Sequence, residues 1–184
     1  IMGNRRFSRK RLFEVEKRGQ TIDLGSGAGI AGAVARATQH RQGQEIITEI
    51  VMDLGVASHA IVAGGGAGQA VGVLNTDSHI AKLTVAKYGI VSEVRAVCVE
   101  ACSRDVDVIL SATDNTIQGG TPGSQTSVLA GAVTVGKDNS ADLDAGTVFN
   151  LYIVDGDGTG SEAAINDGKL LIYVHGFVAP DDLA

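Results

Sequence analysis

The sequence predicts an all-β fold, an antiparallel β-sandwich or barrel of about seven to eight strands with an extended N-terminal arm. Short stretches rich in Val, Ile and Thr recur along the chain, and turn-forming runs such as GGTPGS and GKDNS separate them. Helical periodicity is not sustained over about twelve residues anywhere. Strands without intervening helices also disfavour a parallel sheet.

The size and composition fit one domain with its own core. The chain has 184 residues, and its apolar fraction of 44% excludes disorder over its whole length. No apolar run approaches the roughly 18 residues that a membrane-spanning helix needs, so we expect no segment to cross a bilayer. An aromatic content of 4% without tryptophan disfavours the stacking platforms of single-strand nucleic-acid binders.

The first predicted strands lie in the N-terminal half. Residues 20–24 alternate and predict a short strand, and residues 45–55 predict a strong one. In the second of these, Ile46, Thr48, Ile50 and Met52 share the face that is apolar enough for a core. Residues 60–63 and 71–74 resemble strands only weakly, around the flexible run GGGAG.

The later strands follow at loop-sized intervals. Residues 80–101 form the longest β-rich segment, in which Gly89 predicts a bulge or bend. Further strands are predicted at residues 106–112, 128–135, 148–154 and 169–178. This pattern divides the chain into an arm of residues 1–24, a glycine-rich hinge of residues 25–44 and a β-rich body of residues 45–184.

Charge is distributed unevenly between the arm and the body. Residues 1–18 hold seven basic and two acidic side chains, a net charge of +5, whereas the remaining residues hold 8 basic and 19 acidic side chains, a net charge of −11. A basic arm on an acidic body indicates that the arm binds a different surface. A solvated, partly disordered terminus is the alternative.

Among possible surfaces for the arm, another protein is the one we favour. Membrane docking requires a strong apolar face, and the arm offers only Phe7, Leu12, Phe13 and Val15 as large apolar residues. Nucleic acid would be repelled by the acidic body. The arm also lacks the apolar segment of a secretion signal, and we expect translation to begin at Met2.

The two cysteines, Cys98 and Cys102, are predicted to be free and buried. Four residues apart on an extended strand, they would lie on the same face about 13 Å from each other, which is too far for a disulfide. Free cysteines are consistent with assembly in a reducing cytoplasm.

A literal GxGxxG motif runs from Gly27 to Gly32 and raises the alternative of a dinucleotide-binding enzyme. In such a site the glycines would let the backbone approach a pyrophosphate at a helix N-terminus. The preceding strand is short and half polar, however, and no second βαβ unit follows. We therefore interpret the motif chiefly as a flexible loop.

Other motifs indicate neither a metal site nor catalysis. The run DGDGTG at residues 155–160 resembles the start of a calcium loop, but its twelfth position is Asn166 and we expect a turn between strands. The four histidines lack metal-ligand spacing, and His175 is expected to be a packed or interface residue. We predict no catalytic residue, no cofactor and no metal.

Four stretches together resemble small structural proteins of the virions of marine tailed bacteriophages: NRRFSRKRLFEVEKRGQTIDL, ATQHRQGQEIITEIVMDLG, AKYGIVSEVRAVCVEA and GKLLIYVHGFVAP. They cover about 40% of the chain, chiefly its two ends. The resemblance implies a role and no catalytic site. It implies a protein that decorates or cements the capsid surface as a homotrimer after assembly in the host cytoplasm, with the major capsid protein as its partner.

In this interpretation the arm docks on capsid subunits, adding a strand to an exposed sheet edge. The residues predicted to bind the capsid are Arg5, Arg6, Phe7, Arg9, Lys10, Arg11, Leu12, Phe13 and Val15. The cationic members would meet acidic residues of the shell, and the apolar members would act as anchors. Another virion role, in the tail, the head–tail joint or a fibre, is the first alternative, and a non-viral binding module is a further one.

Overall fold

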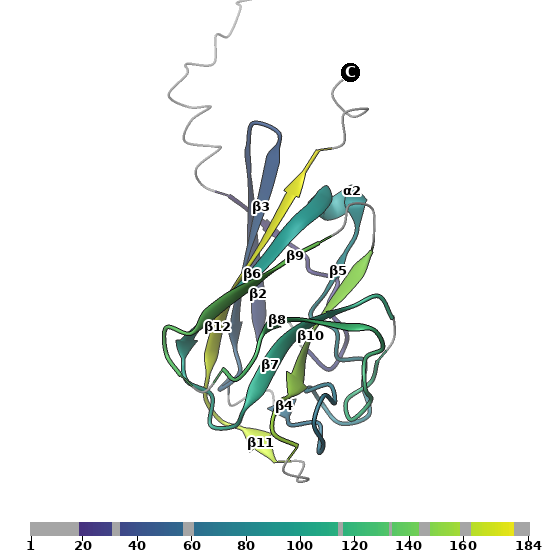
Figure 1. Cartoon of the computed structure of the whole chain (residues 1–184), viewed down its shortest axis with the longest axis vertical. Coiled ribbons are helices and arrows are strands. Elements are labelled where there is room, and N and C mark those ends of the chain that lie inside the picture. Colours follow the sequence, from purple (N-terminus) through teal and green to yellow (C-terminus); the bar gives the residue numbers. More distant parts are fainter. Residues whose placement is uncertain are drawn as a thin grey trace, which may run out of the picture.

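The computed structural model describes residues 19–30, 34–56, 61–113, 116–132, 134–143, 148–158 and 163–178, which form two facing β-sheets and a small third one (Figure 1). The larger sheet contains, in spatial order, β1 (Gln20–Ile22), β2 (Ala35–Gln42), β3 (Glu45–Asp53), β12 (Lys169–Phe177), β6 (Ile90–Glu100) and β9 (Asp138–Asp142). The smaller sheet contains β5 (Ala81–Leu83), β10 (Phe149–Asp155), β7 (Val106–Ser111) and β8 (Gln125–Leu129). The third pairs β11 (Ala164–Ile165) with β4 (Ile61–Val62), and α2 (Val85–Tyr88) is a single helical turn.

The larger sheet buries one face and exposes the other. Alternate residues of β3 and β12, such as Ile50 and Ile172, are fully buried against the smaller sheet. The register places Val51 beside Leu171 on the opposite face, where Val51 is 42% exposed. This alternation is the two-residue period of a half-buried antiparallel sheet.

The two central strands of the smaller sheet, β10 and β7, are buried on both faces. Its inner face contributes Leu151 and Ile153 to the main core, while Tyr152 and Ile109 on its outer face form a second apolar cluster. The chain's own loops cover this outer face: the Tyr152 hydroxyl donates to the Thr113 carbonyl at 3.3 Å.

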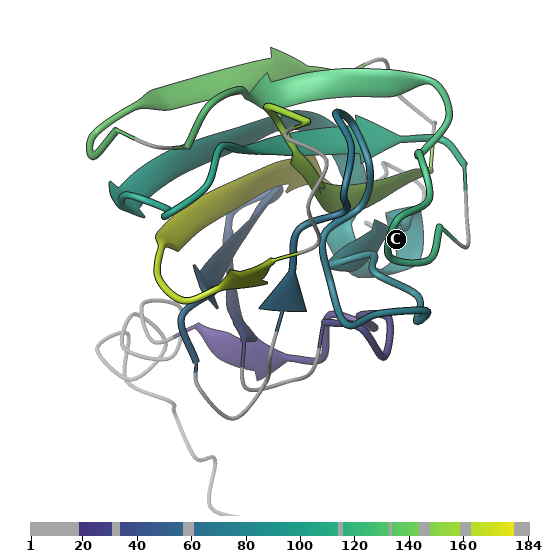
Figure 2. The same cartoon turned by 90° about the horizontal axis from the view of Figure 1, so that it is seen from below.

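The sandwich has two ends that are used as reference points below. The arm end contains the β2–β3 hairpin turn, α2, the start of β1 and the end of β12, and it lies at the top of Figure 1. The far end contains the ends of β3, β6 and β10 and the starts of β12 and β7. Figure 2, seen from below, shows β1 in purple at one side of the molecule and the green strands at the other.

Two glycines let α2 and β12 approach each other closely at the arm end. A Cβ on Gly176 would overlap the Tyr88 carbonyl oxygen, and one on Gly89 would overlap that of Phe177. Gly89 also has a φ of +70°, which favours glycine. The backbone of the two elements therefore packs directly, and α2 closes this end of the sandwich.

The predicted all-β class is confirmed, and the architecture is a sandwich because its main sheets do not close into a barrel. The described residues contain twelve strands, more than the seven or eight predicted. The alternation predicted for residues 45–55 is confirmed, since Thr48, Ile50 and Met52 are all fully buried.

Several element boundaries differ from those predicted. The expected arm of residues 1–24 contains β1, and the expected hinge of residues 25–44 contains all of β2, so both contribute to the larger sheet. The single segment expected at residues 80–101 is divided into β5, α2 and β6, because the chain crosses there from one sheet to the other. β9 lies in a run expected to be a turn, because it is an exposed edge strand with polar side chains.

Candidate functional site at the arm end

The nine residues predicted to bind the capsid lie within residues 1–18, outside the described part of the chain. The described chain begins at Gly19, whose φ of +56° lies in the left-handed region. The next residue, Gln20, pairs with Gln39 in the register of β1 and β2. The arm therefore joins the body beside the β2–β3 hairpin.

A cavity of about 370 Å³ opens where the arm joins the body. Its wall is formed by β1, the β2–β3 hairpin and α2, through Gly19, Gln20, Gln39, His40, Arg41, Ile46, Ala86 and Lys87. We call it the arm-end pocket. Gln39 ties its walls together, since its side-chain amide donates to Thr48 Oγ1 at 2.9 Å and to the Lys87 carbonyl at 3.0 Å.

Two basic residues, Arg41 and Lys87, line the arm-end pocket, and neither forms an ion pair with a carboxylate in the described part of the chain. Arg41 Nε donates to the Gly43 carbonyl at 2.9 Å, and Lys87 Nζ donates to the Asp23 carbonyl. The Asp23 carboxylate instead accepts the Gly25 amide at 2.9 Å. Backbone carbonyls hold these two cations in place without neutralising them.

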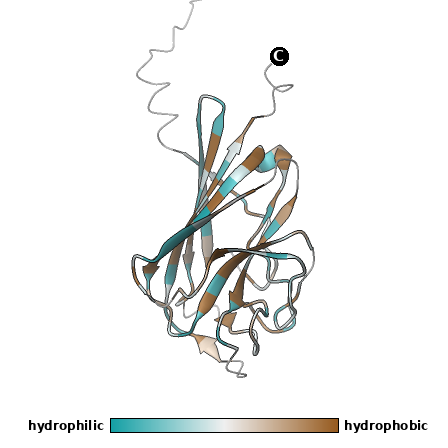
Figure 3. Ribbon diagram, viewed as in Figure 1, coloured by the Kyte–Doolittle hydropathy of each residue, from teal (hydrophilic) through white to brown (hydrophobic). Residues whose placement is uncertain are grey.

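The surface around this pocket is mixed in character. The hairpin turn is hydrophilic (Figure 3), whereas Phe177 and Val85 expose 45% and 40% of their surface. His175 Nδ1 lies 2.8 Å from Glu45 Oε1, which agrees with the expectation that this histidine is a packed residue. Among the described residues, the arm end thus combines basic side chains without a carboxylate partner, exposed apolar side chains and the His175–Glu45 contact.

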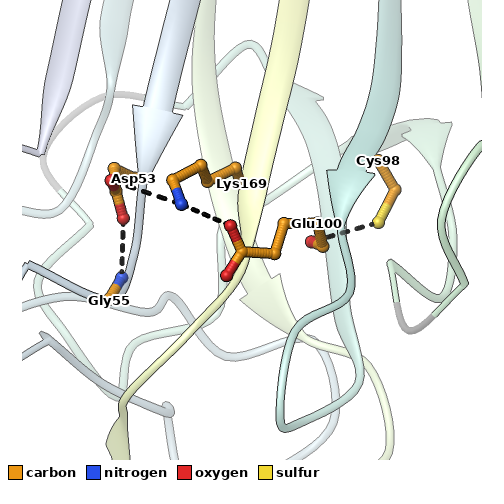
Figure 4. A network of polar contacts seen from close by, with 5 residues as sticks. All are labelled: Asp53, Gly55, Cys98, Glu100 and Lys169. Carbon is orange, nitrogen blue, oxygen red and sulfur yellow. Dashed lines mark hydrogen bonds and ion pairs between the residues drawn. The ribbon is translucent and has the colours of Figure 1, made fainter.

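At the far end, Lys169 is paired with carboxylates within the fold. Lys169 Nζ lies 3.8 Å from Asp53 Oδ2 and also pairs with Glu100, so that one lysine connects three neighbouring strands (Figure 4). On the same sheet face, Arg95 pairs with Asp138. Each of these basic side chains has a carboxylate within reach.

Aspartates gather at the far end around the turn after β10. Burial and the neighbouring Asp107 and Asp157 carboxylates raise the pKa of Asp105 above its usual range. The Gly158 amide donates to Asp155 Oδ1 at 3.3 Å, as in the turn predicted for this segment. No group of three His, Cys, Asp or Glu side chains among the described residues is arranged to hold a metal ion.

The glycine-rich motif packs against the body rather than forming an open loop. The Gly27 amide donates to the His79 carbonyl at 2.8 Å, and the Gly29 amide donates to the Asp77 carbonyl at 2.7 Å. A Cβ on Gly27 would overlap the Asp77 backbone, which explains the glycine there. These two amides are already bonded within the fold and are not free to hold a pyrophosphate.

A second cavity, of about 640 Å³, lies between this motif and the first two strands. Its lining includes Ser26, Gly27, Asp23 and Arg36, together with small apolar residues of β2. The described element that follows the motif is β2, whereas a dinucleotide site requires a helix there. Gly32 lies outside the described residues.

Both cysteines are free and buried, as predicted. Cys102 lies beyond the end of β6, so the two do not share one strand face as expected. Burial, followed by nearby negative charge, raises the pKa of the Cys102 thiol to about 12, and burial also raises the pKa of Cys98. Neither thiol has the lowered pKa of a nucleophile.

Sequence reasoning missed the pocket cations. Arg41 fell in the expected hinge and Lys87 in an expected strand, 46 positions later, and no motif connects them. Only the folding of α2 onto the hairpin brings them to one cavity.

Comparisons with models of known families, with curated proteins and with solved structures gave no match. Within the described ranges, no helix has the length and hydropathy that crossing a bilayer would require.

Proposed function

We propose that this chain is a non-enzymatic structural protein of a bacteriophage virion, which decorates the capsid through its basic arm. The observation that carries the proposal is where the arm joins the body. Residues 1–18, with a net charge of +5, meet the sandwich at Gly19, in the wall of a pocket that holds Arg41 and Lys87. A basic segment is therefore attached to the same end of the sandwich where Arg41 and Lys87 lie, which suits oriented docking on an acidic protein surface.

The arm end also supports docking through apolar contact. Phe177 and Val85 are exposed there, and the arm itself carries Phe7, Leu12 and Phe13. In the proposed mechanism, the arm adds a strand to a sheet edge of the capsid subunit, and its basic side chains meet acidic residues of the shell. The body forms a homotrimer, and binding through several arms offsets the entropy lost when each arm becomes ordered.

Removal of residues 1–18 tests this function directly. All buried core residues in the described part of the chain lie between Leu24 and Val174, so we expect the shortened protein to keep its fold and its melting temperature. Co-sedimentation with capsids that lack the protein should show loss of attachment. Unchanged occupancy of the capsid by the shortened protein would overturn the proposal.

The oligomeric state is a second, independent test. Light scattering behind a sizing column measures the mass of the full chain in solution. A mass near three times 18.8 kDa supports a trimeric clamp on the capsid. A monomer at high concentration would remove the trimer from the proposed function and favour another virion role, in the tail or the head–tail joint.

A further inference from the structure

We infer that the arm-end pocket is a binding site for a carboxylate-bearing segment of the docking partner. This inference rests on the proposed function and deepens it, because it assigns part of the recognition to the folded body as well as to the arm. The site is the cavity of about 370 Å³ between β1, the β2–β3 hairpin and α2.

The charges of the pocket indicate the chemistry of its ligand. Arg41 and Lys87 both line the cavity, and the side chain of each donates one hydrogen bond to a backbone carbonyl. Arginine has five N–H donors and lysine has three, so donors remain for a second partner. No carboxylate within the described residues forms an ion pair with either side chain. A carboxylate is the protein group that satisfies both the charge and the remaining donors.

The elements that carry Arg41 and Lys87 are held together by direct contacts. Gln39 bonds to both Thr48 and the Lys87 carbonyl, so α2 is held against the larger sheet. Gly176 permits direct backbone packing of β12 against the last residue of α2. The side chains of Ile46 and Ala86 add apolar surface, which suits a segment that alternates acidic and apolar residues.

The position beside Gly19 explains why the two binding elements would act together. Gly19, in the wall of the pocket, directly follows the basic residues Lys17 and Arg18 in the sequence, so a ligand in the pocket is only a few residues along the chain from the basic segment. A partner with one acidic segment can contact both, and the second contact then forms at high effective concentration.

Nuclear magnetic resonance of the full chain tests the pocket residue by residue. A hexaglutamate peptide is titrated into the protein, with hexaglutamine as the uncharged probe. We expect amide shifts at Gly19, Gln39–Arg41 and Ala86–Lys87 with hexaglutamate only, and weaker binding as the salt concentration rises. Shifts confined to residues 1–18, or no shifts at millimolar peptide, would overturn the inference.

Matched neutralising variants complete the test. The double variant Arg41→Gln, Lys87→Gln keeps an amide donor at each site, and we expect it to bind the peptide about 3- to 10-fold more weakly, the scale of two partly exposed ion pairs. Lys137→Gln removes one charge from an exposed position far from the pocket and should bind like the parent. Equal binding by the double variant and the parent would refute the pocket.

The failure of this inference can be told apart from failure of the proposed function. If arm removal abolishes capsid attachment but the double variant binds hexaglutamate normally, the function stands and the pocket assignment is wrong. If the pocket binds hexaglutamate but arm removal leaves attachment unchanged, the pocket stands and the arm-mediated function is wrong.

Discussion

The two ends of the sandwich differ in how their positive charges are neutralised. At the far end, Lys169 lies between Asp53 and Glu100 and connects three strands. At the arm end, the side chains of Arg41 and Lys87 bond to backbone carbonyls, and the described residues offer them no carboxylate partner. Ion pairs at the far end connect neighbouring strands, whereas Arg41 and Lys87 have no carboxylate partner among the described residues. The comparison shows that one fold can neutralise a lysine in one place and hold basic side chains by backbone carbonyls alone in another.

The largest expected effect is on the rate at which the buried Cys102, at the far end, reacts with a thiol reagent. At pH 8, a thiol with a pKa of about 12 is roughly one part in ten thousand thiolate, compared with about a quarter for an unperturbed thiol. We therefore expect Cys102 to react with a thiol reagent about a thousandfold more slowly in the native protein than in denaturant. Stopped-flow labelling measures both rates. Rapid labelling of the native protein would show that the far end opens readily and exposes Cys102 to the reagent.

The next prediction concerns the direct packing of backbone at the arm end. Gly176→Val would force a side chain into the Tyr88 carbonyl, so we expect the free energy of unfolding to fall by about 3 kcal/mol. Gly43→Ala in the hairpin turn is the matched control. Its φ is +64° and nothing lies within 4 Å of the new Cβ, so only about 1 kcal/mol is lost. Urea denaturation of the two variants measures the difference, and equal losses would contradict close packing of α2 on β12.

A smaller effect on stability is expected when one cation is removed from each end of the sandwich. Lys169→Gln removes the cation between Asp53 and Glu100, so we expect a small fall in the urea midpoint. Arg41→Gln removes a cation that has no carboxylate partner among the described residues, so its urea midpoint should match that of the parent. High salt should reduce the effect of the Lys169 variant, because the side chains are exposed to solvent. If Arg41→Gln were the more destabilising variant, the contrast between the ends would be wrong.

The smallest prediction concerns the aspartates of the far end. The pKa of Asp105 is raised in the folded state, so the native protein binds more protons than the unfolded protein as the pH falls toward that pKa. Asp105 therefore lowers stability above its folded pKa and loses this effect in acid. Asp105→Asn should raise the free energy of unfolding at pH 7 by about 0.5 kcal/mol, because solvent screens this partly exposed group. The advantage should disappear near pH 3, as urea titrations at the two pH values would show.

The strands that could be predicted are those in which apolar and polar residues alternate with the two-residue period of the backbone. In β3 and β12, apolar residues alternate because one face of each strand packs on the core, and this produced correct strands. β2 was missed because its sequence, ARATQHRQ, has only two buried alanines to mark the inner face. β9 was missed for a related reason, since its DNSAD sequence belongs to an exposed edge.

The candidate site shows a different limit of sequence reasoning. The charge of the arm is visible in the sequence, and the predicted partner-binding residues depend on it alone. The pocket beside the arm depends on α2, a four-residue turn that carries Lys87 to the hairpin. Such a short turn has no helical periodicity to detect, so the meeting of Lys87 and Arg41 follows only from the three-dimensional structure.

The place of β12 in the larger sheet has a consequence for synthesis of the chain. β12 is the last strand in the described sequence, yet it lies between β3 and β6 and hydrogen-bonds to both. The centre of the sheet therefore cannot form until residues 169–177 have been synthesised and have left the ribosome. Such long-range pairing is slow. Until β12 is available, β3 and β6 have unpaired edges that can pair with other chains and aggregate. A ribosome that stalls before β12 would release a chain with no stable larger sheet.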